Sequence, residues 1–260
     1  MDLYIVANKE EISRLGYQVI MSVVENKNDV TLGLATGSSP EGIYELFRTH
    51  QPDMSHVTTV NLDEYIGLPK DHPQSYAHFM NEQLFKHLTF KANHIPDGMN
   101  TDQAAECARY DAILEANVPD LQLLGIGTNG HIAFNEPVTD FGLTTHVETL
   151  VEETIAANSR FFKTPEEVPT TAYTMGIKSI MEAKEILLIA SGASKAEAIK
   201  AMLEGEITEA MPASILKQHP NVIAIIDQEA ASLIDPALLQ QAGGGCCGGH
   251  GGGCGGCGSH

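Results

Sequence analysis

The chain has 260 residues, of which 43% are hydrophobic and 19% charged, a balance typical of a compact globular protein. Its 34 acidic and 15 basic side chains give a formal net charge of -19, a field that repels nucleic acid and anionic lipid surfaces. We therefore expect neither nucleic acid nor a membrane as a partner. A phosphate group would have to be held by local donors, such as a helix N-terminus and a few placed cations.

The start of the chain lacks the basic and apolar regions of a secretory signal, and no run approaches the roughly 18 apolar residues that span a bilayer. Cys107 is the single cysteine before residue 243, so residues 1–242 can form no internal disulfide and suit a reducing compartment. We interpret Cys107, which stands in a helical pattern, as a packing residue. These features predict a cytoplasmic protein.

Short apolar runs of the length of buried strands alternate with amphipathic segments of helical spacing. The predicted strands, which we expect to be buried on both faces, are Leu3–Val6, Thr31–Ala35, Val57–Leu62, Leu121–Ile126, Ile186–Ala190 and Val222–Ile226. The predicted helices are Lys9–Glu25, Glu41–Arg48, Ser75–His87, Thr101–Ala116 and Lys195–Leu203. Asn8 and Glu11 are spaced as in a capping box at the first helix. The alternation predicts a doubly wound, mostly parallel α/β sheet with helices on both faces, forming one domain over residues 1–242.

Polar segments follow four of these strands directly, at residues 36–39, 63–65, 127–131 and 191–192. Ligands of open α/β sheets bind beyond the carboxyl ends of the strands. We therefore expect these four loops to converge on one crevice.

The first of these loops, Thr36-Gly37-Ser38-Ser39, joins a strand to a helix that begins near Glu41. Glycine lets the backbone approach an anion, and the free amides and hydroxyls of such a turn can donate to it. The same residues also suit an ordinary capped turn before a helix. The motif alone leaves both interpretations open.

The second loop presents adjacent carboxylates, Asp63 and Glu64, at a strand end. A desolvated carboxylate there could serve as a general base next to a carbonyl or imine. Aspartate after a strand is also a common turn former, which is the competing interpretation.

The third loop, residues 125–137 (GIGTNGHIAFNEP), contains three glycines, His131 and Glu136. The imidazole can change charge near neutral pH, and the glutamate could orient it. The glycine spacing also resembles a dinucleotide-binding loop, but no long helix follows and no acidic residue closes a second strand at the usual distance. We therefore expect no nicotinamide cofactor.

Three blocks of the sequence resemble the glucosamine-6-phosphate deaminases, within the wider group of glucosamine-6-phosphate isomerases and 6-phosphogluconolactonases. The blocks are residues 61–76 (NLDEYIGLPKDHPQSY), 130–137 (GHIAFNEP) and 158–162 (NSRFF). They occur in the family's order, and the resemblance extends from Leu3 to about Asp227. It implies conversion of glucosamine 6-phosphate and water to fructose 6-phosphate and ammonia by an isomerising hydrolase of C–N bonds, with no cofactor and no active-site metal.

The resemblance also implies roles for individual residues. Asp63 matches the base that moves the C2 proton, His131 the residue that assists ring opening, and Glu136 its supporting carboxylate. The sugar phosphate is expected to bind the turn formed by residues 36–39. Two cations, Arg160 and Lys195, complete that phosphate site. The planar guanidinium of Arg160 can donate two hydrogen bonds to a phosphate, and Lys195 brings a positive charge at the start of a helix.

The sequence departs from the family pattern at two places. The family's best-known enzymes have aspartate where this chain has Asn129, which cannot add a second negative charge beside the imidazole. We expect this change to tune ring opening without abolishing it. Allosterically activated members use basic residues in the region of His146 and Glu148, which carry no permanent positive charge here. The sequence thus predicts a non-allosteric monomer or small homo-oligomer.

Residues 243–260 (GGGCCGGHGGGCGGCGSH) contain four of the five cysteines and two histidines. Such dense glycine predicts a disordered tail, whereas the thiols and imidazoles could bind zinc or copper(I). Residues 161–169 (FFKTPEEVP) form either an inert surface loop or a mobile lid.

Two other functions fit the same fold. A 6-phosphogluconolactonase shares the Gly-His loop but needs no C2 base, so Asp63 argues against it. A sugar-phosphate sensor of a transcriptional regulator would carry a basic helix-turn-helix segment, and this sequence has none.

Overall fold

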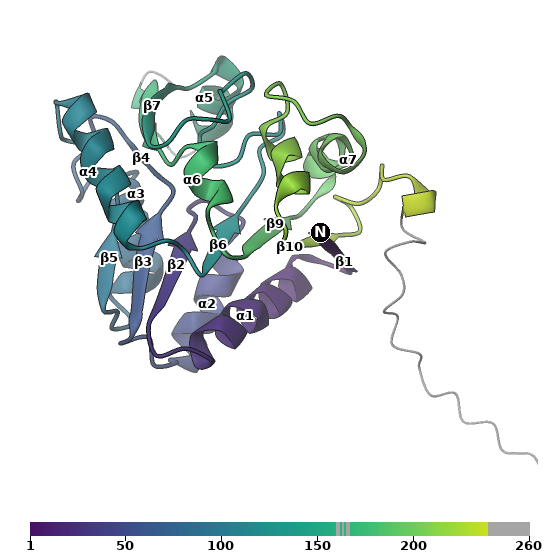
Figure 1. Ribbon diagram of the computed structural model, residues 1–260, viewed down its shortest axis with the longest axis horizontal. Coiled ribbons are helices and arrows are strands. Elements are labelled where there is room, and N and C mark those ends of the chain that lie inside the picture. Colours follow the sequence, from purple (N-terminus) through teal and green to yellow (C-terminus); the bar gives the residue numbers. More distant parts are fainter. Residues whose placement is uncertain (160–161, 163, 165–166, 239–260) are drawn as a thin grey trace, which may run out of the picture.

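The computed structural model describes residues 1–159, 162, 164 and 167–238. Its larger sheet has seven parallel strands in the order β1-β10-β9-β6-β2-β3-β5 (Figure 1). Their bounds are β1 Asp2–Val6, β2 Val30–Leu34, β3 Val57–Asn61, β5 Ala92–His94, β6 Leu121–Leu124, β9 Ile186–Ala190 and β10 Val222–Asp227. The predicted parallel α/β sheet is confirmed, and each of the six predicted strands is present in it.

The N-terminal strand corrects one part of that prediction. β1 was expected to be buried on both faces, but Tyr4 and Ile5 are 47% and 39% exposed. The reason is position, because β1 pairs with β10 alone and ends the larger sheet. An edge strand is covered less completely than a central one, although its sequence is equally apolar.

Helices cover both faces of the larger sheet, with α1 and α2 on one side and α6 and α7 on the other (Figure 1). The helical elements are α1 Lys9–Glu25, α2 Glu41–His50, α3 Tyr76–Met80, the π-helical turn η1 Asn81–Phe85, α4 Gln103–Ala116, α5 Glu152–Asn158, α6 Ile177–Met181, the 3-10 turn η4 Ala193–Lys195, α7 Ala196–Glu204 and the 3-10 segment η5 Pro212–Gln218. At α1, the Asn8 side chain accepts from Glu11 N at 2.9 Å. Ala7 N donates to the Glu11 carboxylate. The predicted cap therefore forms, but the glutamate binds the residue before Asn8, whereas in the usual capping box it binds the N-cap residue itself.

A second, antiparallel sheet of three strands was not predicted. Its order is β4-β8-β7, with β4 Asp63–Tyr65, β8 Thr171–Thr174 and β7 His146–Thr149. β4 begins two residues after β3 ends, so the chain passes from one sheet into the other at Leu62. Asp63 therefore starts a strand and is not part of a turn.

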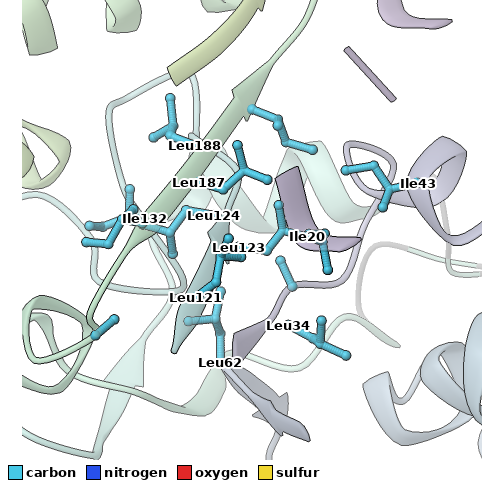
Figure 2. Close-up of a cluster of buried hydrophobic side chains, with 14 of the residues drawn as sticks. Ile20, Leu34, Ile43, Leu62, Leu121, Leu123, Leu124, Ile132, Leu187 and Leu188 are labelled. Carbon is cyan, nitrogen blue, oxygen red and sulfur yellow. The ribbon is translucent and has the colours of Figure 1, made fainter. Parts of the chain in front are cut away.

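The hydrophobic core anchors the segments that carry the predicted site residues. Leu62, next to Asp63, and Ile132, next to His131, are 3% and 0% exposed. Figure 2 shows both side chains in one cluster with leucines of the central strands β6 and β9. Because such interiors are close-packed, the backbone beside each site residue is held by the core.

Several predictions fall wholly or partly outside the described residues. Arg160 and the tail 243–260 lie outside them, as do residues 161, 163, 165 and 166 of the loop. The phosphate contact of Arg160, the choice between loop and lid, the domain boundary at 242 and metal binding by the tail therefore stay predictions. None of the described helices has the length and apolarity needed to span a membrane.

Candidate active site

A cavity of about 220 Å³ opens where β2, β3 and β6 end, and residues of the three loops that follow these strands line it. Thr36, Gly37, Ser38 and Ser39 line it together with Asp63, Gly127, His131 and Lys195. Lys195 represents the loop after β9, since residues 191 and 192 themselves do not line the cavity. The predicted convergence is thus confirmed for three of the four loops, and the loop at residues 191–192 is not part of the cavity lining.

The turn at residues 36–39 provides no side-chain cap for α2, and its binding of an anion stays a prediction. It leads into α2, where Tyr44 N donates to Pro40 O at 3.0 Å, and it also forms part of the cavity wall. Gly37 has φ +84°, and a Cβ built on it would meet nothing within 4 Å. The backbone at Gly37 is therefore left uncovered, as an anion-binding turn requires.

The two adjacent carboxylates have different environments. Asp63 is 6% exposed and lines the cavity, and burial, together with the charge of Glu64, raises its pKa well above the usual value. Glu64 does not line the cavity, and its carboxylate accepts from the backbone N–H groups of Tyr65, Tyr76 and Ala77 at 2.8 to 2.9 Å. Burial raises the pKa of Glu64 to about 7 against these hydrogen bonds. Glu64 thus fixes the start of α3, whereas Asp63 faces the cavity as a potential base.

His131 lies between the cavity and a buried carboxylate. Its Nδ1 is 3.3 Å from Oε2 of Glu136, and the same oxygen accepts from Nδ2 of Asn129 at 2.9 Å. Glu136 is 2% exposed; burial opposes its ionisation, but the adjacent imidazole of His131 and the hydrogen bond from Asn129 hold the pKa of Glu136 below its usual value. An ionised Glu136 can orient the imidazole and stabilise its protonated form.

Hydrogen bonds within the loop hold the segment that carries His131. His131 N donates to Oδ1 of Asn129 at 3.2 Å, and Gly127 N donates to His131 O at 2.9 Å. Gly130 has φ +84°, and Ala133, which lines the cavity, has φ +51°. Backbone in the left-handed region is costly for alanine and is found at sites whose surroundings enforce it.

Further residues that sequence reasoning did not assign to the site also line the cavity, among them Tyr76, Phe134, Glu153, Thr154 and Asn158. Asn158 also donates from Nδ2 to the Tyr65 hydroxyl at 2.9 Å, which ties α5 to β4. Tyr76 and Asn158 stand inside the blocks that carry the family resemblance, and this was the signal that could have found them. Among the described residues, no group of three or more His, Cys, Asp or Glu side chains is arranged to hold a metal ion.

The fold and the cavity together define an α/β protein in which Asp63 and His131 share a cavity with the turn at residues 36–39. The chain belongs to the family of glucosamine-6-phosphate isomerases and 6-phosphogluconolactonases, whose family model matches residues 9–224. It is 55% identical over 241 residues to a glucosamine-6-phosphate deaminase of Bacillus cytotoxicus, covering 93% of this chain and 92% of that protein. It is 54% identical over the same length and coverage to the deaminase of Bacillus cereus.

Solved structures agree with this assignment. A monomeric glucosamine-6-phosphate deaminase superposes with a TM-score of 0.86 at 45% identity, covering 90% of this chain and all of that one. A 6-phosphogluconolactonase from Trypanosoma cruzi superposes with a TM-score of 0.73 at 16% identity, covering 89% of this chain and 96% of that one. The second likeness concerns the fold alone.

Proposed function

We propose that this protein is a glucosamine-6-phosphate deaminase, which converts glucosamine 6-phosphate and water to fructose 6-phosphate and ammonia. One observation carries the proposal. The buried carboxylate of Asp63 and the imidazole of His131, which lies against Glu136, face a single cavity that the turn at residues 36–39 also lines. The relatives named as deaminases support the same activity, because this chain matches them over nearly its whole length.

The first step is ring opening, and His131 performs it. Its imidazole, held by Glu136 on Nδ1, presents the other ring nitrogen to the ring oxygen of the pyranose and protonates it as the C1–O5 bond breaks, while the C1 hydroxyl gives its proton to water. The product is an open-chain aldehyde with an amino group at C2. Asn129 takes part through Glu136, whose Oε2 it holds.

The second step is isomerisation, and Asp63 performs it. Its carboxylate removes the proton from C2 while the aldehyde oxygen takes a proton from water, giving an enolamine, and it then returns its proton to C1. The resulting imine at C2 is hydrolysed by water to a ketone and ammonia. A carboxylate with a raised pKa suits this step, because a base stronger than an ordinary aspartate transfers a carbon-bound proton more readily.

The phosphate group is placed at the start of α2. The backbone amides and hydroxyls of residues 36–39 would donate to it, with Lys195 supplying a positive charge from the opposite loop. Arg160 is assigned to the same group on the family resemblance alone. A net charge of -19 repels a phosphate at long range, so the site depends on local donors such as these.

Four subsidiary proposals accompany the reaction. The protein acts as a hydrolase of C–N bonds, needs no cofactor because the substrate's own amine and carbonyl supply the electron sink, works in the cytoplasm, and is a monomer or small homo-oligomer. The monomeric deaminase of similar structure supports the last of these. The tail at 243–260 has no part in the proposed reaction.

The test is to incubate the purified protein with glucosamine 6-phosphate and to measure ammonia and fructose 6-phosphate. Asp63→Asn should lower kcat by roughly a thousandfold, the range expected for loss of a general base. Asp120→Asn is the matched control: Asp120 is 7% exposed but binds Lys27 and Lys184 away from the cavity, so kcat should stay near that of the parent protein.

Two results would contradict the proposal. Release of acid from 6-phosphogluconolactone without ammonia from glucosamine 6-phosphate would identify a lactonase. Binding of sugar phosphates without turnover of either substrate would favour a sensor.

A further inference from the structure

Lys195, which the proposed function assigns to phosphate binding, stands on a turn that a buried carboxylate of the neighbouring strand holds. Asp227 is the last residue of β10 and is 6% exposed. Its two carboxylate oxygens accept from the backbone N–H of Gly192 at 3.0 and 2.9 Å, and Oδ1 also accepts from Ala230 N at 2.8 Å. Asp227 therefore joins the loops that follow β9 and β10.

The conformation of Gly192 explains why this turn needs an external support. Gly192 has φ +88° and ψ 153°, a combination that L side chains rarely adopt. Immediately after it, the 3-10 turn Ala193–Lys195 closes by a hydrogen bond from Lys195 N to Gly192 O at 3.0 Å, and α7 begins at Ala196. The direction in which Lys195 leaves the turn is thus set by the peptide that Asp227 holds.

Lys195 lines the cavity, whereas Asp227 does not. We propose that Asp227 is a positioning residue for phosphate binding: by fixing the Gly192 amide, it places the Lys195 ammonium opposite the turn at residues 36–39. This inference rests on the proposed function. A bound carboxylate is suited to the task, since charge-assisted hydrogen bonds to backbone N–H groups are about twice as strong as neutral ones.

The test separates substrate binding from chemistry. Asp227→Asn keeps the shape of the side chain but either turns an N–H donor towards the Gly192 amide or removes one of its acceptors. KM for glucosamine 6-phosphate should therefore rise about tenfold, while kcat should change less than about threefold. The Kd for glucitol 6-phosphate, which carries the phosphate but no carbonyl and cannot react, should rise by the same factor in calorimetry.

A double-mutant cycle asks whether Asp227 acts through Lys195. Lys195→Met alone should raise KM, and Asp227→Asn should then add less than about twofold in the Lys195→Met background. Asp120→Asn is the matched control for loss of a buried carboxylate; it should leave KM and the Kd for glucitol 6-phosphate unchanged even if it lowers Tm.

A second variant covers the case in which Asp227→Asn does not fold. Gly192→Ala has room for its Cβ, whose nearest neighbour would be the Glu229 carboxylate at 4.0 Å, but it is strained at φ +88° and should shift the same turn and raise KM. The inference is overturned if the folded variants keep the KM of the parent protein, if kcat falls while KM stays constant, or if the effects of Asp227→Asn and Lys195→Met are additive. A parent protein that releases no ammonia would instead contradict the proposed function, and the glucitol 6-phosphate measurement would still test the turn.

Discussion

Asn129 donates a hydrogen bond of 2.9 Å to the same oxygen of Glu136 that faces the imidazole of His131. A neutral amide therefore stands where a carboxylate would bring a second charge to the pair. Hydrogen bonds to charged groups contribute about 1.5–3 kcal/mol each. Asn129→Leu removes this donor together with the acceptor for His131 N, so we expect kcat/KM to fall by about 10- to 100-fold, as measured by ammonia release.

The neighbouring residue provides the control for that variant. Thr128 lines the cavity with an exposed side chain, whose hydroxyl donates to the exposed side chain of Glu153. Thr128→Val should change kcat/KM less than about threefold, because exposed hydrogen bonds contribute little. Equal losses in Asn129→Leu and Thr128→Val would mean that the loop tolerates no change, and would remove the evidence for a specific role of Asn129.

The raised pKa of Asp63 predicts the pH dependence of kcat. The base must be ionised, and below its pKa it is protonated, so kcat should fall as the pH falls through that value. Because burial and the Glu64 charge raise the pKa, this limb should lie well above pH 4, where an ordinary aspartate titrates. Glu64→Gln removes the added charge and should move the limb to lower pH. A limb that stays in place in Glu64→Gln would show that the charge of Glu64 does not act on Asp63.

The sequence predicted the strands for a simple reason. β9 (ILLIA) is a continuous apolar run, and a central parallel strand requires such a run on both faces. β5 has no such signal, because Ala92-Asn93-His94 is short, polar and at the edge of the sheet. The small antiparallel sheet was also missed, since Asp63-Glu64-Tyr65 has a strand conformation that its charged residues disfavour and that pairing with β8 imposes.

The site residues that directly follow strands could be predicted from the sequence. Those brought to the cavity by tertiary contacts could not. The topology of a parallel sheet places Asp63 and His131 at one edge, whereas the family resemblance supplied their expected roles. Tyr76 enters the cavity because Glu64 binds the first amides of α3, a tertiary contact that spacing along the chain does not reveal. Asp227 is likewise separated from Gly192 by 35 residues, so its role required the structure.

The close approach of Gly130 to Met211 predicts a loss of stability on adding one methyl group. A Cβ on Gly130 would lie 2.0 Å from Sδ of Met211, and φ there is +84°. Gly130→Ala should lower the free energy of unfolding by about 2–4 kcal/mol, combining backbone strain with overlap, as measured by urea denaturation. Gly37→Ala has the same φ with nothing within 4 Å, so it should cost only the strain, about 1–2 kcal/mol.

Met211 allows the two contributions in Gly130→Ala to be separated. In the Met211→Ala background the overlap disappears, so the further loss on changing Gly130 should shrink towards that of Gly37→Ala. An undiminished loss in that background would show that the backbone conformation, and not the methionine, excludes a side chain at residue 130.

A histidine–glutamate pair on β7 predicts a pH-dependent contribution to stability. Nε2 of His146 is 3.4 Å from Oε2 of Glu148, and its Nδ1 is 2.8 Å from Thr144 O. Burial lowers the pKa of His146, but the hydrogen bonds to Glu148 and Thr144 outweigh it and raise the pKa above its usual value. Although burial opposes ionisation of Glu148, the hydrogen bond from His146 lowers the pKa of that carboxylate.

The sign of the effect follows from linkage. A histidine whose pKa is raised by folding stabilises the native state fully below its unfolded pKa, near 6.5, and this contribution is lost as the pH rises through the raised value. His146→Gln should therefore lower the free energy of unfolding by about 0.5 kcal/mol more near pH 6 than near pH 8.5, the small size reflecting solvent screening of a partly exposed pair. Urea denaturation at the two pH values measures it. Glu148→Gln should show the same pH dependence and add nothing to it in the double variant, whereas equal losses at both pH values would show that His146 contributes by packing alone.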